Sequence, residues 1–128
     1  MNKIQLIDTL PNVFLSRSDI MSDIWQQKVT FEKGGLYLVE ANSGTGKSSL
    51  CSYIFGYRHD YQGQILFDGE DISRYAVGKW TEIRKRHIAL LWQELRLFPE
   101  LTAWENVQIK NKLTGFQKKK QIEEWFEM

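Results

Sequence analysis

The residues from Ala41 to Ser48 have the types and the spacing most suited to chemistry in this 128-residue chain. They read A-N-S-G-T-G-K-S, which matches the phosphate-binding pattern G-x-x-x-x-G-K-[ST] with alanine in place of the first glycine. Gly44 and Gly46 let the backbone wrap around phosphate oxygens without a Cβ in the way. Lys47 is placed to reach the β- and γ-phosphates, and the Ser48 hydroxyl is placed to ligate Mg²⁺. The pattern therefore predicts that the chain binds a nucleoside triphosphate.

The segments on either side of this loop are the elements that would position it. Leu36–Glu40 predicts a buried strand that enters the loop, and Ser48–Phe55 predicts a helix that leaves it. The N–H groups at a helix N-terminus point at a bound anion, and the helix dipole favours negative charge there. The helix is expected to end near Gly56, a residue suited to the position after the last turn.

The rest of the pattern predicts a mixed set of strands and helices. Gly63 and the pair Asp68-Gly69 are predicted to be turns on either side of a strand. Ile88–Trp92 is a continuous apolar run, which predicts a strand buried on both faces. Besides that run, we expect strands at Ile4–Ile7, Val29–Phe31 and Gln64–Phe67, and helices over Trp80–Arg86 and from about Gln117 onward.

The composition is that of an ordinary globular domain, with 42% hydrophobic and 26% charged residues. The net charge of +1 gives no general electrostatic case for nucleic acid, and the short basic runs Arg84–Arg86 and Lys118–Lys120 are typical of solvated helix faces. The single Cys51 excludes an internal disulfide and suits a reducing compartment. No apolar run reaches membrane-spanning length, so we expect the chain in the cytoplasm.

From the phosphate loop to Val107, the sequence resembles the nucleotide-binding domain of ABC transporter ATPases. Leu90–Val107, read L-L-W-Q-E-L-R-L-F-P-E-L-T-A-W-E-N-V, is similar to the Q-loop segment of that family. The stretch Gly63–Ile72 lies between the two motifs and reads G-x-I-x-x-D-G-x-D-I. Within the family, the chain is most similar to the ATPases of lipoprotein-release, macrolide-export and cell-division type systems.

The resemblance implies an α/β fold, a partial P-loop NTPase. Residues 1–93 would form the N-terminal part of the ATP-binding core, a RecA-like core with an antiparallel β subdomain. Residues 94–128 would be the start of a helical subdomain, which the chain contains only in truncated form. The predicted helix runs up to Met128 without a capping residue, which is a further reason to expect a fragment.

The resemblance also implies a set of site residues. In the family, the glutamine matched by Gln93 contacts Mg²⁺ and the attacking water, and an aromatic near the position of Phe14 stacks on adenine. The implied nucleotide-binding residues are Phe14, Asn42, Ser43, Gly44, Thr45, Gly46, Lys47, Ser48 and Ser49, with Lys47 and Gln93 as catalytic residues and Ser48 and Gln93 as metal ligands.

The implied function is that of an ATP-binding subunit that uses ATP and Mg²⁺ and couples their binding and hydrolysis to a transmembrane permease. The full-length protein would pair head to tail with a second ATPase subunit, peripheral on the inner face of the cell membrane, without binding nucleic acid. Leu95, Leu97, Phe98 and Leu101 suit either docking of the permease or plain core packing, and the sequence leaves both open.

Several parts of a working ATPase of this family are not found in the sequence. No L-S-G-G-Q signature occurs, and no apolar strand ending in Asp-Glu follows Gln93. We therefore expect the full-length protein to be an ATPase and this chain alone to lack activity. The alternative is a short nucleotide-binding module that regulates or scaffolds without hydrolysis. A GTPase is disfavoured because Asn111–Thr114 lacks the aspartate that reads guanine.

Overall fold

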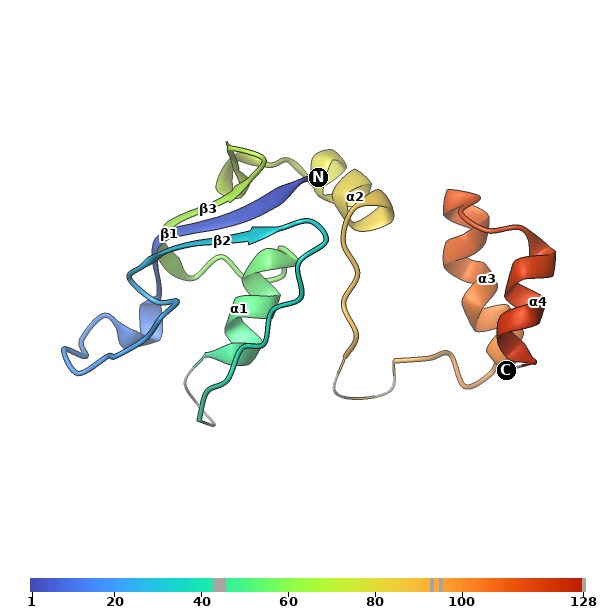
Figure 1. The fold of residues 1–128 in the computed structure, drawn as a ribbon, viewed down its shortest axis with the longest axis horizontal. Coiled ribbons are helices and arrows are strands. Elements are labelled where there is room, and N and C mark those ends of the chain that lie inside the picture. The colour runs from blue at the N-terminus through green and yellow to red at the C-terminus, as the bar shows by residue number, and fades with distance from the viewer. Residues whose placement is uncertain (43–45, 93, 95, 128) are drawn as a thin grey trace. The chain divides into compact units, whose positions relative to one another are not determined.

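A computed structural model describes residues 1–42, 46–92, 94 and 96–127 of the chain (Figure 1). The chain divides into two compact units, Met1–Thr81 and Glu82–Met128. The domain boundary predicted from the resemblance, between residues 93 and 94, stays a prediction. The architecture is mixed α/β, as expected.

The first unit is built on a four-stranded antiparallel sheet in the order β2-β1-β3-β4. Leu6 and Ile65 face each other across the two central strands and are fully buried, so the apolar face of the sheet forms the core. The described structure confirms the strands predicted around Ile4–Ile7, Val29–Phe31 and Gln64–Phe67. The strands are β1 (Lys3–Pro11), β2 (Lys28–Glu32), β3 (Tyr61–Phe67) and β4 (Glu70–Asp71).

Gly63 lies inside β3 and not in a turn before it, so the prediction of a turn at this residue was wrong. The pairing of β1 with β3 shifts register between Ile7 and Leu10, which marks a β-bulge. Gly63 has φ +85° there, and a Cβ on it would lie 2.3 Å from the carbonyl oxygen of Asp8. Glycine supplies a positive φ to a bulge as readily as to a turn, and the strand continues because Tyr61 still pairs with Pro11.

The predicted turn at Asp68-Gly69 is confirmed, because both residues have positive φ, 49° and 85°, between β3 and β4. The Asp68 carboxylate also accepts hydrogen bonds from the backbone N–H groups of Asn2, at 2.8 Å, and Lys3, at 3.0 Å. These two bonds lower the pKa of Asp68. The turn thus fastens the beginning of β1 to the end of β3.

Helix α1 (Lys47–Ile54) follows the phosphate-loop segment and ends where expected, because Gly56 comes two residues after its last turn with φ +77°. The helix packs through Tyr53, which is fully buried. The ring of Tyr53 lies 4.9 Å, centroid to centroid, from that of Tyr61 on β3. Two short 3₁₀ segments, η1 (Asn12–Phe14) and η2 (Ile72–Arg74), complete the first unit.

Helix α2 (Val77–Arg86) includes the predicted helix Trp80–Arg86, spans the boundary between the units and has basic residues in its last turn. In the second unit, α3 (Ala103–Thr114) and α4 (Lys119–Phe126) form a helical hairpin (Figure 1), with the rings of Trp104 and Phe126 5.8 Å apart. Thr102 and Glu105 form a reciprocal capping box at the start of α3. Helix α4 confirms the helix predicted from about Gln117.

Two strand predictions were wrong. Leu36–Glu40 and Ile88–Trp92 are extended segments that pair with no strand among the described residues. Leu36, Leu38 and Leu91 are 101%, 83% and 97% exposed. Apolar composition makes a segment suitable for a buried strand, but a strand forms only where a neighbouring strand supplies hydrogen bonds and other elements cover its faces.

Within the part of the chain that the structure describes, no helix combines the length and the apolar character needed to cross a lipid bilayer.

Candidate nucleotide-binding site

The N-terminus of α1 has the features of an anion site. Gly46 is the N-cap residue, in a left-handed conformation with φ 101° and ψ 13°. Among the described residues, no side chain caps this helix end, and the first turn contains no acidic residue. The intrahelical bonds begin with the N–H of Leu50, which donates to the carbonyl of Gly46 at 2.9 Å. The earlier N–H groups of the turn are therefore available to an anionic ligand.

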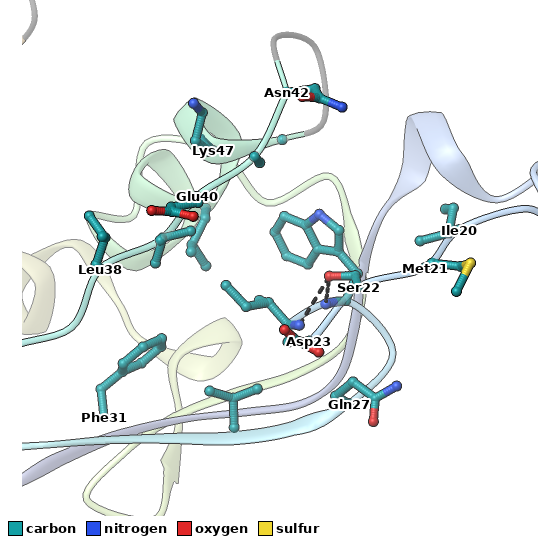
Figure 2. Close-up of a pocket in the computed structure, with 17 residues that line it drawn as sticks. Ile20, Met21, Ser22, Asp23, Gln27, Phe31, Leu38, Glu40, Asn42 and Lys47 are labelled. Atoms are coloured by element: carbon teal, nitrogen blue, oxygen red, sulfur yellow. Dashed lines mark hydrogen bonds between the residues drawn. The ribbon is translucent and has the colours of Figure 1, made fainter.

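This helix end opens into a pocket with a volume of about 810 Å³. In Figure 2, Lys47 and Glu40 come from the segments that flank the phosphate loop, and Ser22 and Asp23 come from a turn on the opposite side. The volume is sufficient for a nucleotide. The lining residues are Ile20, Met21, Ser22, Asp23, Ile24, Trp25, Gln27, Val29, Phe31, Leu38, Val39, Glu40, Ala41, Asn42, Gly46, Lys47 and Leu50.

The charges around the pocket are mixed. Lys47 is exposed at the helix end, and Asp23 and Glu40 also line the pocket. Two carboxylates repel a triphosphate, whereas Lys47 and the amides in the first turn of α1 attract it. The end of the pocket beside α1 is thus the part suited to phosphate.

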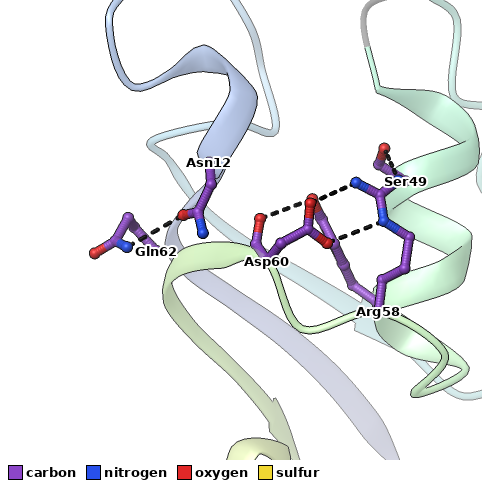
Figure 3. Close-up of polar contacts among 6 residues, drawn as sticks. Asn12, Ser49, Arg58, Asp60 and Gln62 are labelled. Atoms are coloured by element: carbon purple, nitrogen blue, oxygen red, sulfur yellow. Dashed lines mark hydrogen bonds and ion pairs between the residues drawn. The ribbon is translucent and has the colours of Figure 1, made fainter.

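Ser49, in contrast to Ser48, is committed to contacts within the protein (Figure 3). Arg58 donates to the Ser49 hydroxyl at 2.9 Å and forms a two-pronged ion pair with the Asp60 carboxylate. The hydrogen bond from Arg58 lowers the pKa of Asp60. This network links the first turn of α1 to the loop before β3, so Ser49 supports the position of the helix, while the exposed Ser48 hydroxyl remains open to a ligand.

The structure does not place Phe14 at this pocket. Phe14 ends η1, is half-buried, and lies under the guanidinium of Arg17, 5.4 Å from the ring centroid. The aromatic side chain that lines the pocket beside Gly46 is Trp25, which sequence reasoning did not single out. Nothing in the spacing separates Trp25 from the other four tryptophans, because its position depends on a turn that only the folded chain reveals.

The predicted site residues Ser43, Gly44, Thr45 and Gln93 lie outside the described residues, as does Leu95 of the predicted docking set. Asn42 and Gly46, which flank the first three, both line the pocket. Lys47 lines it as well, so the structure brings three of the predicted nucleotide-binding residues together around one pocket.

Among the described residues, no three His, Cys, Asp or Glu side chains cluster in a way that could hold a metal ion. Mg²⁺ bound with a nucleotide does not need such a cluster, since it is commonly held by one or two protein oxygens together with phosphate oxygens and water. The exposed Ser48 hydroxyl, next to Lys47, is an oxygen of this kind. The residues present therefore fit Mg²⁺ that arrives with a triphosphate.

Comparison with known proteins gives consistent results. Residues 25–128 match the model of a family described as "ABC transporter". The chain is 33% identical over 85 residues to the ABC transporter ATP-binding protein YtrE of Bacillus subtilis, an alignment that covers 66% of this chain and 37% of YtrE. It is 35% identical over 97 residues to the aliphatic sulfonates import ATP-binding protein SsuB of Bacillus cereus, covering 76% of this chain and 35% of SsuB.

A more distant relative is the glycine betaine/proline betaine transport system ATP-binding protein ProV of Escherichia coli, 26% identical over 101 residues, with 79% of this chain and 25% of ProV aligned. The chain thus spans between a quarter and about two fifths of the length of these relatives. No solved structure matches the chain significantly. The family match covers most of the chain and includes the phosphate loop, α1 and the Q-loop segment, and so the chain belongs to the ABC transporter ATP-binding family.

Proposed function

We propose that the chain binds MgATP in the pocket at the N-terminus of α1. The observation that carries this proposal is a helix end that no side chain of the described residues caps and that has no acidic residue in its first turn. Beside it, Lys47 and Gly46 line a pocket of nucleotide size. Family membership supports the same ligand, since the relatives are named as ATP-binding proteins.

In this proposal, Lys47 holds the β- and γ-phosphates as a point charge and the backbone amides of the first turn of α1 bind their oxygens. The Ser48 hydroxyl provides the protein oxygen for the metal. Mg²⁺, when bound, neutralises negative charge on the phosphate oxygens and holds them in one orientation. Gln93 is proposed as the group that orients the attacking water in the full-length protein, because it matches the family's Q-loop glutamine.

The whole protein is proposed to work as the ATP-binding subunit of a transporter, peripheral on the inner face of the cell membrane. It would pair head to tail with a second ATPase subunit and hydrolyse ATP to move a membrane partner. The relatives support this role by name, as transport system and import proteins. For this chain by itself we propose binding without turnover, because the sequence contains neither the signature nor the Asp-Glu strand.

The proposal is tested by measuring the affinity of the chain for MgATP by calorimetry, in the wild type and in Lys47→Ala. A hydrogen bond from a charged group contributes about 1.5–3 kcal/mol, so the substitution is expected to weaken binding by roughly ten- to a hundredfold. Phosphate release is followed in the same samples, and no turnover above the buffer rate is expected.

Lys79→Ala is the matched control, since Lys79 is an exposed lysine of the same unit that pairs with Glu70 and does not line the pocket. It should bind MgATP as the wild type does. Equal affinity of the wild type and Lys47→Ala would contradict the proposed site. Phosphate release at ordinary enzyme rates that disappears in Lys47→Ala would contradict the proposed inactivity of the chain.

We also propose that the membrane partner docks on the second unit. A pocket of about 360 Å³ lies between the segment after α2 and the α3–α4 hairpin, with an apolar wall that includes Val107, Phe116 and Trp125. Lys85, Arg86 and Lys110 line it too, and none of its lining residues is acidic. An amphipathic segment of the membrane partner that presents an apolar side chain flanked by carboxylates would complement this surface.

Of the residues that the sequence suggested for docking, Leu97 and Phe98 are exposed and Leu101 is half-buried, but none of the three lines this pocket. A photo-cross-linking amino acid at position 116 or 125, in cells that express the full-length protein with its membrane subunit, is expected to give an adduct with that subunit. Position 113 is the control, because Leu113 is an exposed residue of α3 that does not line the pocket. Equal adducts from 113 and 116 would contradict the proposed surface.

A further inference from the structure

Trp25 contacts the cap residue of the phosphate-binding helix. A Cβ built on Gly46 would lie 2.9 Å from Cζ2 of the Trp25 ring and 3.1 Å from its Nε1. Gly46 has φ +101°, a conformation that favours glycine, and the indole fills the space on its side-chain face. The ring and the turn into α1 are therefore in direct van der Waals contact, immediately before Lys47.

The Trp25 ring is enclosed by protein. The residue is 7% exposed, and its ring meets that of Tyr53 in an edge-to-face contact at 6.5 Å. Tyr53 is itself a fully buried residue of α1, whose hydroxyl donates to the carbonyl of Asp60 at 3.2 Å. The indole thus contacts α1 both at its cap and on its buried face. So little free ring surface is a poor platform for stacking a base.

The backbone that carries Trp25 is fixed to the central sheet. The Ser22 hydroxyl accepts the N–H groups of Ile24 at 3.0 Å and Trp25 at 2.9 Å, which closes a tight turn. The next residue, Gln26, has φ +61° and donates its N–H to the carbonyl of Thr9 on β1 at 3.0 Å. Asp8 of β1 in turn donates to the carbonyl of Gln27 at 3.1 Å. The turn is thus bonded to β1 through the two residues that directly follow Trp25.

We infer that Trp25 is a positioning residue of the phosphate site, which holds the N-terminus of α1 at a set position against β1. The inference rests on the proposed function. The strength of an anion site at a helix end depends on several N–H groups converging on one point, so a shift of the helix end weakens all of these bonds together. Trp25 then acts on the phosphates of the ligand through Gly46 and has no part in recognising the base.

The test compares two ligands, MgATP and Mg-tripolyphosphate, which share the phosphates and differ in the nucleoside. In Trp25→Leu, the intact chain should bind both ligands about tenfold more weakly, so that the ratio of the two affinities stays constant. Trp25→Phe restores a flat ring beside Gly46 and should recover most of the loss for both. Val77→Ala is the control, because Val77 is an apolar residue of the same unit that is 83% exposed and does not line the pocket.

Each outcome is decisive. If Trp25→Leu loses affinity for MgATP and keeps that for tripolyphosphate, the ring supports the nucleoside and the inference is overturned. If both affinities match those of the wild type, Trp25 positions nothing and the inference fails while the proposed function stands. If the wild type binds neither ligand, the proposed function fails, and the inference with it. Amide hydrogen exchange tests the inference without a ligand. Trp25→Leu should increase the exchange rate of the amides of Ser48–Leu50 and leave that of Ile65–Phe67 unchanged. A change of the same size in both segments would contradict the inference.

Discussion

Tyr61 is a buried phenol whose hydroxyl has no hydrogen-bond partner within the part of the chain that the structure describes. Burial raises its pKa from the ordinary value of 10.0 to about 12. The neighbouring Tyr53, whose ring lies 4.9 Å from that of Tyr61, is fully buried, and its hydroxyl donates to the carbonyl of Asp60. These neighbouring tyrosines, whose ring planes are tilted by 54°, therefore offer a comparison between a hydroxyl with and a hydroxyl without a hydrogen-bond partner among the described residues.

Replacement of Tyr61 by phenylalanine is expected to leave the free energy of unfolding at neutral pH unchanged or slightly higher, because it removes a buried hydroxyl that makes no hydrogen bond to the described residues. Tyr53→Phe should lower it by about 1 kcal/mol, the typical net contribution of one hydrogen bond. Urea unfolding at pH 7 measures both. A larger loss in Tyr61→Phe than in Tyr53→Phe would indicate that the Tyr61 hydroxyl is bonded after all.

The raised pKa of Tyr61 also predicts a pH dependence. The folded state holds the phenol proton more tightly than the unfolded state, so the stability contributed by the neutral phenol is fully present below pH 10 and is lost as the pH rises from 10 to 12. The melting temperature of the wild type should fall through this range. In Tyr61→Phe the fall should be shallower, and an identical slope in the two proteins would show that Tyr61 does not contribute.

At the scale of the elements, the pairing of β1 with β3 depends on Gly63 more strictly than the turn between β3 and β4 depends on Gly69. Gly63 and Gly69 both have φ +85°, but a Cβ on Gly63 meets the Asp8 backbone at 2.3 Å, whereas a Cβ on Gly69 has no atom of the described residues within 4 Å. The two positions share the strain of the left-handed conformation and differ only in the collision. Alanine substitutions at the two positions therefore distinguish the cost of the left-handed conformation from the cost of a steric collision.

Gly69→Ala is expected to cost about 1–2 kcal/mol, the ordinary penalty for a side chain in this conformation. Gly63→Ala should cost distinctly more, because the backbone of β1 must also move away from β3. Thermal unfolding followed by circular dichroism measures both variants. Equal costs would mean that the bulge can open freely and that β1 and β3 are less firmly paired than the structure indicates.

Helix α3 owes its defined start to the capping box. The Thr102 hydroxyl accepts the N–H of Glu105 at 3.1 Å, and the Glu105 carboxylate accepts the N–H of Thr102 at 3.0 Å. Thr102→Ala is expected to cost about 1 kcal/mol and to reduce the helical signal of the second unit. Thr102→Ser keeps the hydroxyl and serves as the control. A helical signal unchanged by Thr102→Ala would mean that tertiary packing alone fixes the start of α3.

At the scale of the whole molecule, the chain leaves two extended apolar segments uncovered, around Leu38 and Leu91, which are 83% and 97% exposed. Exposed apolar segments with unpaired backbone groups favour association between chains. The double variant Leu38→Lys with Leu91→Lys should therefore reduce association of this chain without lowering its melting temperature. Leu6→Lys, at a fully buried position, should unfold it.

Light scattering across a concentration series, together with thermal unfolding, distinguishes these outcomes. If the double variant lowers the melting temperature as much as Leu6→Lys does, the two segments are buried in solution and the described arrangement of these segments is wrong. If association persists at the wild-type level, another surface is responsible, such as the exposed Phe116 and Trp125 of the second unit.

The sequence by itself determined what depends on local residue order. The phosphate loop pattern and the resemblance identified the family, which the family match confirms. Periodicity, glycine placement and charge predicted the helix after the loop, its end at Gly56, the Asp68-Gly69 turn and the strands β1, β2 and β3. These features depend on neighbours within a few positions of the chain.

Only the tertiary structure decided which segments find a partner. Leu36–Glu40 and Ile88–Trp92 have the composition of buried strands, yet the described residues offer neither of them a neighbouring strand. Gly63 serves a bulge because β1 runs opposite it, and Trp25, not Phe14, lies beside Gly46 because a turn bonded to β1 directs it there. Each of these outcomes depends on contacts between residues far apart in the chain, which local patterns do not encode.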